Sequence, residues 1–284
     1  MTFSEIDYQF KGMIILTVDL HIHTTCSDGL RTPEETVKEA LEKNIRAVAI
    51  TDHDITTGID LAIRAAKNTQ LEIIPGVEIN SVWDNEEVHI LGYYIDVESN
   101  SLQSELEHIR QARQTRAENI IKKLQALNYD ISIEDIINLY GNGAIGRPHI
   151  ARALVRKGYY MNTGEVFDRL LARGGKAYVE RYKISPFKAI EMIKDAGGIP
   201  VIAHPGIYKQ EVNWRQIVEY GLMGIEVFHT KHDTKTTNEL LKIANKFNLL
   251  ITGGTDCHGI GSSSLLGTID IPYEVVLRLN EIRS

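Results

Sequence analysis

The sequence contains very little cysteine, since only Cys26 and Cys257 occur among its 284 residues. Two thiols are too few for a disulfide framework, so we expect a reducing compartment. Long apolar runs are also missing, and none approaches the roughly 20 residues that span a bilayer. Residues 1–12 lack the basic-then-apolar order of a signal peptide. These absences together predict a cytoplasmic protein.

An excess of positive charge is missing as well, because the formal net charge is −7. This balance argues against a general nucleic-acid coat. The charges are nevertheless uneven: residues 99–183 carry 14 Lys and Arg against 9 Asp and Glu, which leaves 17 against 29 elsewhere. A basic segment beside an acidic body would suit an anionic substrate held between them. Solvated helical side chains would give the same pattern, and this alternative stays open.

Short apolar strands alternate with amphipathic helices along most of the chain, which predicts βα units around a parallel sheet. The first helix is marked by Thr32-Pro33-Glu34-Glu35, which combines a capping threonine, a proline at the first helical position and a reciprocal glutamate. The expected strands are 14–20, 46–51, 71–79, 88–95, 198–203, 223–228 and 249–254, and later helices are expected at 56–68, 185–197, 213–221 and 236–247.

The alternation stops between residues 99 and 183, where only helical patterns follow one another. These patterns cover 104–127, 132–141, 147–158 and 163–175. We therefore predict a helical insertion, or cap, at 99–183 that divides an α/β barrel into a first part at 13–98 and a second part at 184–284. Whether translation begins at Met13, directly before the first strand, stays open.

Six of the ten histidines lie on or just after a predicted strand, each beside an acid, a glycine or a proline. They are His21, His23, His53, His89, His204 and His258. In an α/β barrel the strands end at one rim, so these distant segments are expected to meet there. Imidazole and carboxylate ligands suit Zn, Mn or Fe, and Asp28, Glu78 and Asp256 would limit the repulsion between adjacent cations. The pattern favours a metal site over six separate structural histidines.

Several short motifs occur in a fixed order over residues 19–258: DLHIHTTCSDG, TDHD, GVEI, HILGY, AHPG and TDCHG. Together they resemble the PHP (polymerase and histidinol phosphatase) family of metal-dependent phosphoesterases. The resemblance is closest to its stand-alone branch of 3′,5′-nucleoside bisphosphate phosphatases and 5′–3′ exoribonucleases. It implies a distorted seven-stranded (β/α)7 barrel with a helical insertion and a site for three divalent metal ions, Mn, Zn or Fe.

The resemblance also implies how nine side chains would share the three metals. The first metal would be held by His21, His23, Glu78 and Asp256, the second by Asp28, His53 and His258, and the third by Glu78, His89 and His204. Glu78 would bridge two of them. Asp28 stands near a position where some tri-zinc members have a histidine, and a harder oxygen ligand shifts the preference toward Mn or Fe.

The activity implied by the resemblance is hydrolysis of a phosphomonoester of a nucleotide, such as AMP or a 3′,5′-nucleoside bisphosphate, or of a short oligoribonucleotide. A metal-activated hydroxide would attack phosphorus, with His53, Asp256 and His229 as candidate catalytic residues. His229, from GIEVFHTKHD, or a metal-bound water would protonate the leaving group. His229 is also a candidate substrate contact, and rim packing is its alternative.

Arg147 and His149, from GRPHIARALV, are the other candidate substrate-binding residues. A guanidinium fork and a helix N-terminus both match phosphate oxygens. The alternative is a structural cap with a surface arginine. The expected partner is a small phosphorylated substrate, or short RNA, with no membrane and no stable protein partner.

Three further acids and the two cysteines leave alternatives open. Asp19 and Asp52 would orient ligand histidines, and a strand-end hydrogen bond is the alternative for Asp19. Asp54 would cap the following helix or serve the site. Both thiols are expected to be structural. The competing functions are a histidinol-phosphate or phosphotyrosine phosphatase on the same barrel, and a non-catalytic metal- or RNA-binding PHP module.

Overall fold

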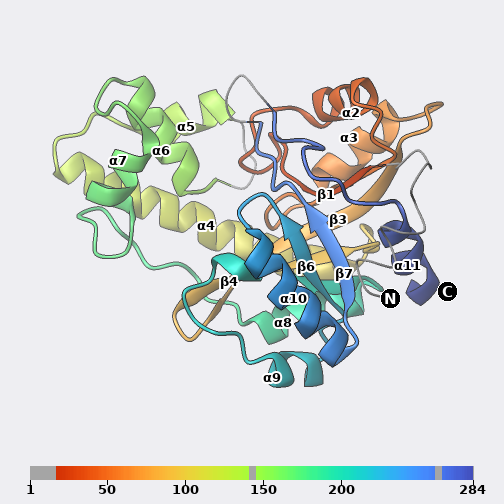
Figure 1. Ribbon diagram of the computed structural model, residues 1–284. Coiled ribbons are helices and arrows are strands. Elements are labelled where there is room, and N and C mark those ends of the chain that lie inside the picture. The colour runs from red at the N-terminus through yellow and green to blue at the C-terminus, as the bar shows by residue number, and fades with distance from the viewer. Residues whose placement is uncertain (1–16, 141–144, 260–263, 284) are drawn as a thin grey trace.

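The computed structural model describes residues 17–140, 145–259 and 264–283. Within these ranges the strands form one sheet in the order β1-β2-β3-β4-β5-β6-β7. Their bounds are β1 Val18–Ile22, β2 Ala47–Ile50, β3 Glu72–Trp83, β4 Glu86–Tyr93, β5 Ile199–Ile202, β6 Gly224–His229 and β7 Leu250–Gly254. The sheet curls into a nearly closed barrel (Figure 1), because the backbone N–H of His23 donates to the carbonyl of Cys257, beyond β7, at 3.0 Å. The predicted seven-stranded α/β barrel is confirmed.

Strand β4 departs from the predicted parallel sheet, since it is antiparallel to both β3 and β5. Only Asp84 and Asn85 connect β3 to β4, and both have left-handed backbone, with φ of 47° and 70°. Two such residues form a type I′ hairpin turn, which is too short for the crossover that parallel strands need. The parallel prediction was therefore wrong at β4, and the barrel is distorted there.

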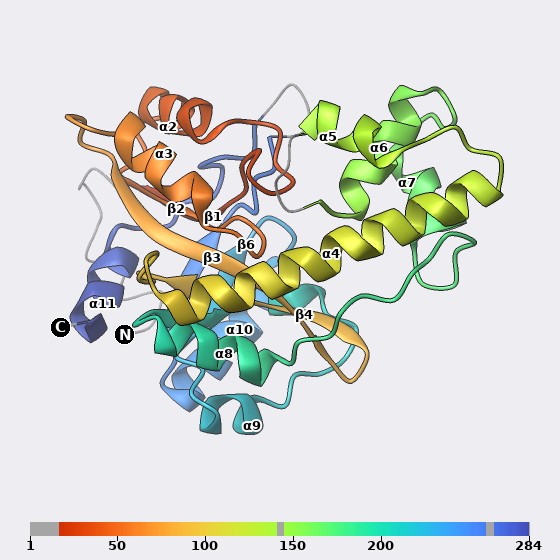
Figure 2. The ribbon, with the colours of Figure 1, turned by 180° about the vertical axis from the view of Figure 1, so that it is seen from behind.

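Six helices pack around the barrel (Figures 1 and 2): α2 Pro33–Glu42, α3 Thr57–Ala65, α8 Pro186–Asp195, α9 Trp214–Glu219, α10 Thr234–Phe247 and α11 Glu274–Arg283. The predicted start of α2 is confirmed, because Thr32 Oγ1 accepts the N–H of Glu35 at 3.2 Å and Glu35 accepts the N–H of Thr32 at 2.8 Å. Such reciprocal bonds satisfy donors that a helix start leaves unpaired.

The barrel interior is filled by apolar side chains such as Leu20, Ala49 and Val201, all fully buried. Val276 and Leu279 of α11 join this interior cluster, so α11 covers one end of the barrel. A second apolar cluster lies between the sheet and the surrounding helices. The opposite end of the barrel is left for the polar side chains described below.

Between β4 and α8 the only regular elements in the described ranges are helical: α4 Asn100–Ala126, α5 Ile133–Tyr140, α6 Arg147–Arg156, α7 Thr163–Val166 and a π-helical turn at Phe167–Leu171. Helix α4 runs from the barrel to the other helices (Figure 2). Its first half packs on the barrel through Leu106, whereas Ile121 and Leu124 belong to a separate apolar cluster of residues 117–177. We call residues 117–179 the helical lobe.

The division into 13–98, 99–183 and 184–284 stays a prediction, and residues 13–16, with the alternative start at Met13, lie outside the described residues. Helix α4 links both cores, so its two halves contribute to different parts of the molecule. None of the helices in the described ranges is both long and apolar enough to cross a bilayer.

Candidate active site

All nine predicted ligand side chains lie together at the open end of the barrel, where they form overlapping groups whose ligand atoms are within 4.8 Å of one another. We call these nine side chains the ligand cluster. The groups are His23, Asp28, His53 and His258; His21, His23 and Asp256; His21, Glu78 and His204; and His53, Glu78 and His89. These groups differ in part from the three implied ligand sets, so the assignment of each side chain to one metal stays a prediction. Neither cysteine joins any group found among the described residues.

Glu78 lies at the centre of the ligand cluster and is almost fully buried. Its Oε2 is 3.3 Å from His21 Nε2, 3.2 Å from His23 Nε2 and 2.9 Å from His53 Nδ1. Its Oε1 is 2.8 Å from His89 Nδ1 and 3.1 Å from His204 Nε2. When two donor atoms each lie about 2.1 Å from the same tetrahedral ion, the two atoms are about 3.4 Å from each other. The spacings therefore fit a carboxylate shared between cations.

Several ligand atoms are buried and have no regular hydrogen bond among the described residues, although some of them lie in ion-pair contact with one another. These atoms are His21 Nε2, His23 Nε2, Asp28 Oδ1, Glu78 Oε2, His89 Nε2 and His204 Nδ1. A buried polar atom without a partner costs about 1–3 kcal/mol, so a cluster of them needs another source of stabilisation. Divalent cations would supply it, and imidazole with carboxylate fits Zn, Mn or Fe. The donor set fits the implied metals.

The charges within the cluster depend strongly on one another. Burial would raise the pKa of Glu78, but His53 and His21 hold it well below its ordinary value. Burial would likewise lower the pKa of His23, but Asp256 and Glu78 raise it to about 10. The carboxylates are therefore charged, and a cation held by these residues would take the place of protons on the histidines.

Glu226 of β6 orients two of the ligand histidines and is fully buried. Its Oε1 accepts the Nδ1–H of His21 at 3.0 Å, and its Oε2 accepts the backbone N–H of His204 at 2.7 Å. Because Nδ1 of His21 is held from behind, Nε2 is presented to the cluster. The sequence prediction gave Glu226 no role, although a charged residue inside the apolar strand GIEVFH is the signal that reveals it.

Asp52 and Asp19 hold the loops that carry the ligands. Asp52 Oδ1 accepts from Ser27 Oγ at 2.5 Å, and Ser27 Oγ lies 3.5 Å from His23 Nδ1, so Asp52 supports a ligand through Ser27. Asp19 Oδ2 instead accepts from Thr255 Oγ1 at 2.6 Å and from the N–H of Gly267 at 2.9 Å. Asp19 therefore follows the strand-end alternative.

Asp54 does not cap helix α3, so that alternative was wrong. The N-cap of α3 is Thr56, whose side chain accepts no capping hydrogen bond. Asp54 is fully buried, accepts the backbone N–H of Asn80 at 3.0 Å and forms an ion pair with Arg113. It therefore joins the end of β2 to β3 and α4.

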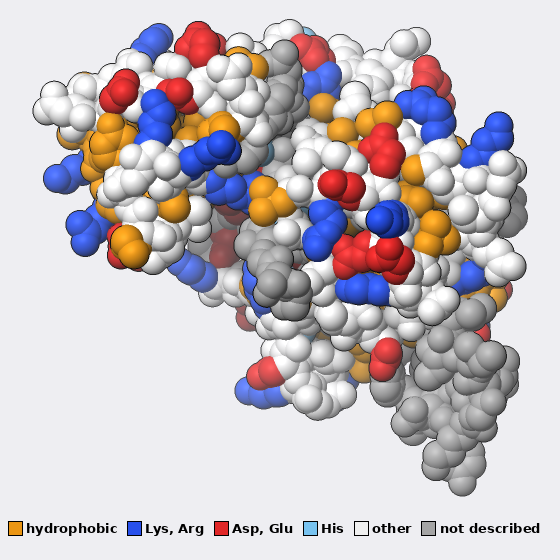
Figure 3. Space-filling model, turned by 90° about the horizontal axis from the view of Figure 1, so that it is seen from above, with side chains coloured by type: hydrophobic (Ala, Val, Ile, Leu, Met, Phe, Trp, Pro, Cys, Tyr) orange, Lys and Arg blue, Asp and Glu red, His pale blue; other side chains and the backbone are white. Residues whose placement is uncertain are grey.

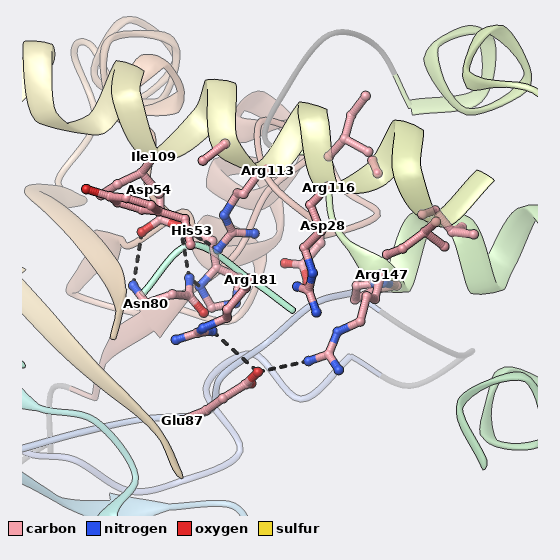
Figure 4. Close-up of a pocket in the computed structure, with 18 of the residues that line it drawn as sticks. Asp28, His53, Asp54, Asn80, Glu87, Ile109, Arg113, Arg116, Arg147 and Arg181 are labelled. Carbon is pink, nitrogen blue, oxygen red and sulfur yellow. Dashed lines mark hydrogen bonds and ion pairs between the residues drawn. The ribbon is translucent and has the colours of Figure 1, made fainter. Parts of the chain in front are cut away.

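Four arginines from distant segments line a cavity of about 150 Å³ beside the ligand cluster (Figure 4). They are Arg113 and Arg116 of α4, Arg147 at the start of α6 and Arg181. Asp28, His53 and His89 of the ligand cluster line the same cavity, which we call the arginine cavity. Seen from above, further Lys and Arg side chains lie over the helical lobe (Figure 3). The predicted basic segment thus faces the site with some of its arginines.

Glu87 of β4 balances part of this positive charge. Its Oε1 lies 2.9 Å from Arg147 Nη2 and 3.4 Å from Arg181 Nη1. Burial would raise the pKa of Glu87, but Arg181 and Arg147 lower it to about 2. Burial and the neighbouring Arg147 lower the pKa of Arg116 to about 10, and its Nη2 is buried with no hydrogen-bond partner among the described residues.

Comparison with known proteins agrees with this arrangement. A family model described as the PHP domain matches residues 19–180. The chain belongs to the PHP family. It is 35% identical over 247 residues to the 5′-3′ exoribonuclease Rnm of Salmonella typhimurium, covering 84% of each chain. It is 33% identical over 263 residues to the 3′,5′-nucleoside bisphosphate phosphatase of Chromobacterium violaceum, covering 90% of this chain and 92% of the other.

The solved structure of a proposed metal-dependent phosphoesterase from Bifidobacterium adolescentis superposes with a TM-score of 0.87 at 32% identity. The match covers 94% of this chain and 96% of that chain. Family, fold and the ligand cluster agree, so this PHP protein is a metal-dependent phosphoesterase, which is a hydrolase. The roles of its individual side chains stay predictions.

His229 turns toward the ligand cluster of this PHP enzyme, although it is not one of the nine predicted ligands. It is buried, and its Nε2 lies 3.6 Å from Asp256 Oδ2. Its Nδ1 accepts the N–H of Lys231 at 3.2 Å, which directs Nε2 inward. His229 thus lies next to the ligand cluster with its side chain fully buried, and its predicted roles stay predictions.

His149 lies behind Arg147 and is nearly fully buried. Its Nδ1 accepts the N–H of Gly146 at 3.0 Å, so it caps the start of α6. Burial lowers the pKa of His149 to about 4. Arg147 lines the arginine cavity, whereas His149 is not among the lining side chains. Its contact with substrate stays a prediction beside the capping role that the structure shows.

Proposed function

We propose that this PHP phosphoesterase hydrolyses a phosphomonoester of a nucleotide, such as AMP or a 3′,5′-nucleoside bisphosphate, or a short oligoribonucleotide. One observation carries the proposal: the four-arginine cavity shares Asp28, His53 and His89 with the ligand cluster. A substrate with two anionic ends would place one at the cluster and the other at the arginines. The names of the exoribonuclease and bisphosphate phosphatase relatives support this substrate class.

The ligand cluster would hold three divalent ions of Mn, Zn or Fe. When bound, these ions supply an activated water and neutralise charge on the phosphoryl oxygens. The protein's own groups position the substrate, because Arg147 and Arg181 present planar forks that match phosphate oxygens. The neutral His229 ring, whose Nδ1 accepts the N–H of Lys231, would donate an Nε2–H hydrogen bond to the leaving oxygen, and water would supply the proton. Positioning and charge stabilisation supply most of the rate in phosphoryl transfer.

The proposal is tested by phosphate release from the purified protein loaded with Mn²⁺. The panel contains AMP, a 3′,5′-nucleoside bisphosphate, a 5′-phosphorylated oligoribonucleotide, histidinol phosphate and phosphotyrosine. We expect the nucleotide substrates to give the highest kcat/KM. Preferred cleavage of histidinol phosphate or phosphotyrosine would contradict the nucleotide assignment, and so would the lack of release from any nucleotide with bound metal confirmed.

Two variants connect the activity to the predicted site. His53→Ala removes a side chain of the ligand cluster, and we expect it to lose at least about 100-fold in kcat/KM, which is the upper range for weakened metal sites. His108→Ala, on the exposed face of α4, is the matched control and should behave like the natural enzyme. Equal cleavage by His53→Ala would show that the active site lies elsewhere.

A further inference from the structure

Three acids occur among the described residues that line the arginine cavity: Asp28, Asp54 and Glu87. Asp28 belongs to the ligand cluster, and Asp54 pairs with Arg113. Only Glu87 of these three therefore faces Arg147 and Arg181. Its carboxylate points from β4 toward the two guanidinium groups (Figure 4). Both arginines approach the same oxygen, Oε1, at 2.9 and 3.4 Å.

The Glu87 carboxylate can leave this position without becoming buried elsewhere. Its side chain is 46% exposed, whereas the side chains of Arg147 and Arg181 are 20% and 14% exposed. A carboxylate that rotates into water regains its hydration, and the incoming phosphate replaces the ion pairs that the two largely buried guanidinium groups lose.

The two arginines have other contacts that would hold them after such a movement. Arg147 Nη1 donates to the carbonyl of Leu171 at 3.4 Å, and its guanidinium lies 5.8 Å from the ring centre of Phe167. Arg181 donates to the carbonyl of Ser81. The pair is therefore fixed partly by groups that a ligand would not displace, which leaves a preformed anion site.

We propose that Glu87 is a resident counter-ion that an incoming phosphate must displace from Arg147 and Arg181, and that it thereby selects a doubly charged terminal phosphate over a singly charged phosphodiester. The inference rests on the proposed function, because it concerns the phosphate that is bound but not cleaved. Exchange of Glu87 for a phosphodiester replaces one negative charge with another, so little Coulomb energy is gained. A terminal phosphate adds a second charge and a third acceptor oxygen. Specificity then comes from the competitor built into the site.

The activity test compares two substrates, a nucleoside bisphosphate and its monomethyl ester at the phosphate that is not cleaved. We expect the natural enzyme to prefer the bisphosphate, and Glu87→Gln to reduce that preference by roughly tenfold, mainly through a lower KM for the ester. The matched control is Glu180→Gln, because Glu180 is 60% exposed and pairs with Lys183 at 2.6 Å instead of the two arginines. An unchanged preference in Glu87→Gln would overturn the inference.

A binding test does not depend on turnover. Sulfate is titrated into metal-free protein at constant ionic strength while the melting temperature is recorded. We expect Glu87→Gln to bind sulfate roughly tenfold more tightly than the natural protein or Glu180→Gln. Weaker sulfate binding together with a higher KM would show that Glu87 positions the arginines, and the inference would be wrong.

The two tests separate this inference from the proposed function. If the natural enzyme releases no phosphate from nucleotides, the proposed function fails, whereas the sulfate titration still measures competition by Glu87. If nucleotides are cleaved but Glu87→Gln leaves both selectivity and sulfate affinity unchanged, only the counter-ion inference fails. If Glu87→Gln has a lower melting temperature than the natural protein without sulfate, and sulfate does not raise it further, the result would also count against the inference.

Discussion

Glu226→Gln is the substitution that best tests how the ligand histidines are oriented. The Glu226 carboxylate offers one oxygen to His21 Nδ1 at 3.0 Å and the other to the N–H of His204 at 2.7 Å. Glutamine keeps the shape but has only one oxygen, so its NH2 group must face one of the two donors. One charge-assisted hydrogen bond is lost, and the buried donor that faces the NH2 group keeps at most a longer contact, such as the 3.3 Å between His21 Nδ1 and Oε2.

The expected magnitudes follow from this exchange. A hydrogen bond to a charged group contributes about 1.5–3 kcal/mol, and an unpaired buried donor costs about 1–3 kcal/mol. We therefore expect the metal-free variant to lose about 2–4 kcal/mol in the free energy of unfolding. Substitution of residues that orient metal ligands lowers metal affinity about 10- to 100-fold, and we expect the same for Mn²⁺ here.

Urea unfolding and calorimetric Mn²⁺ titration measure the two effects separately. Glu239→Gln is the control, since Glu239 is 59% exposed on α10 and pairs with the exposed Lys235. If Glu226→Gln is destabilised but binds Mn²⁺ as tightly as the natural protein, Glu226 supports the fold without tuning the metal site. If neither quantity changes, the reasoning from the hydrogen bonds is refuted.

Arg147→Ala should raise KM for a nucleoside bisphosphate about 10- to 100-fold with little change in kcat, because one phosphate loses a charged partner. A lower kcat at constant KM would contradict this prediction. Gly254→Ala should lower the free energy of unfolding, measured with urea, by about 1–3 kcal/mol or more, because a Cβ there would lie 2.3 Å from His21 Cβ. An unchanged urea midpoint would refute this close approach. The pKa of His149 is about 4 in the folded protein and about 6.5 in the unfolded chain. The unfolded chain therefore binds a proton first as the pH falls below 6.5, and about 3 kcal/mol of the free energy of unfolding is lost by pH 4. Urea midpoints at these two pH values should therefore change less in His149→Gln than in the natural protein, and parallel losses would show that His149 does not titrate in this way.

The ligand cluster could be predicted from the sequence because each ligand follows or lies in an apolar strand. A strand end fixes where a side chain such as His53 or His204 emerges, so local patterns and the barrel rim together bring the nine residues to one place. His204 and Asp256 show what local patterns omit, since both adopt left-handed backbone with φ of 31° and 53°. That conformation aims the side chains and depends on surrounding contacts.

The arginine cavity could be predicted only in part. Arg147 stood out through its helix-start motif, whereas Arg113 and Arg116 look like ordinary solvated helical residues in the sequence. Their role depends on how α4 crosses the open end of the barrel, which is a tertiary property. The antiparallel direction of β4 depends on the two-residue Asp84-Asn85 turn, a short-range hairpin signal that the βα pattern alone does not include.

Metal content measured together with phosphate release tests the central claim most directly, namely that the ligand cluster is a metal site for phosphoester hydrolysis. The protein is stripped with a chelator, titrated with Mn²⁺, and assayed by plasma mass spectrometry and by phosphate release from a nucleoside bisphosphate. We predict that activity rises with bound Mn²⁺ up to three ions per chain, and that His53→Ala lowers both metal content and activity. Full activity of the stripped protein, or full metal content and activity in His53→Ala, would contradict the claim.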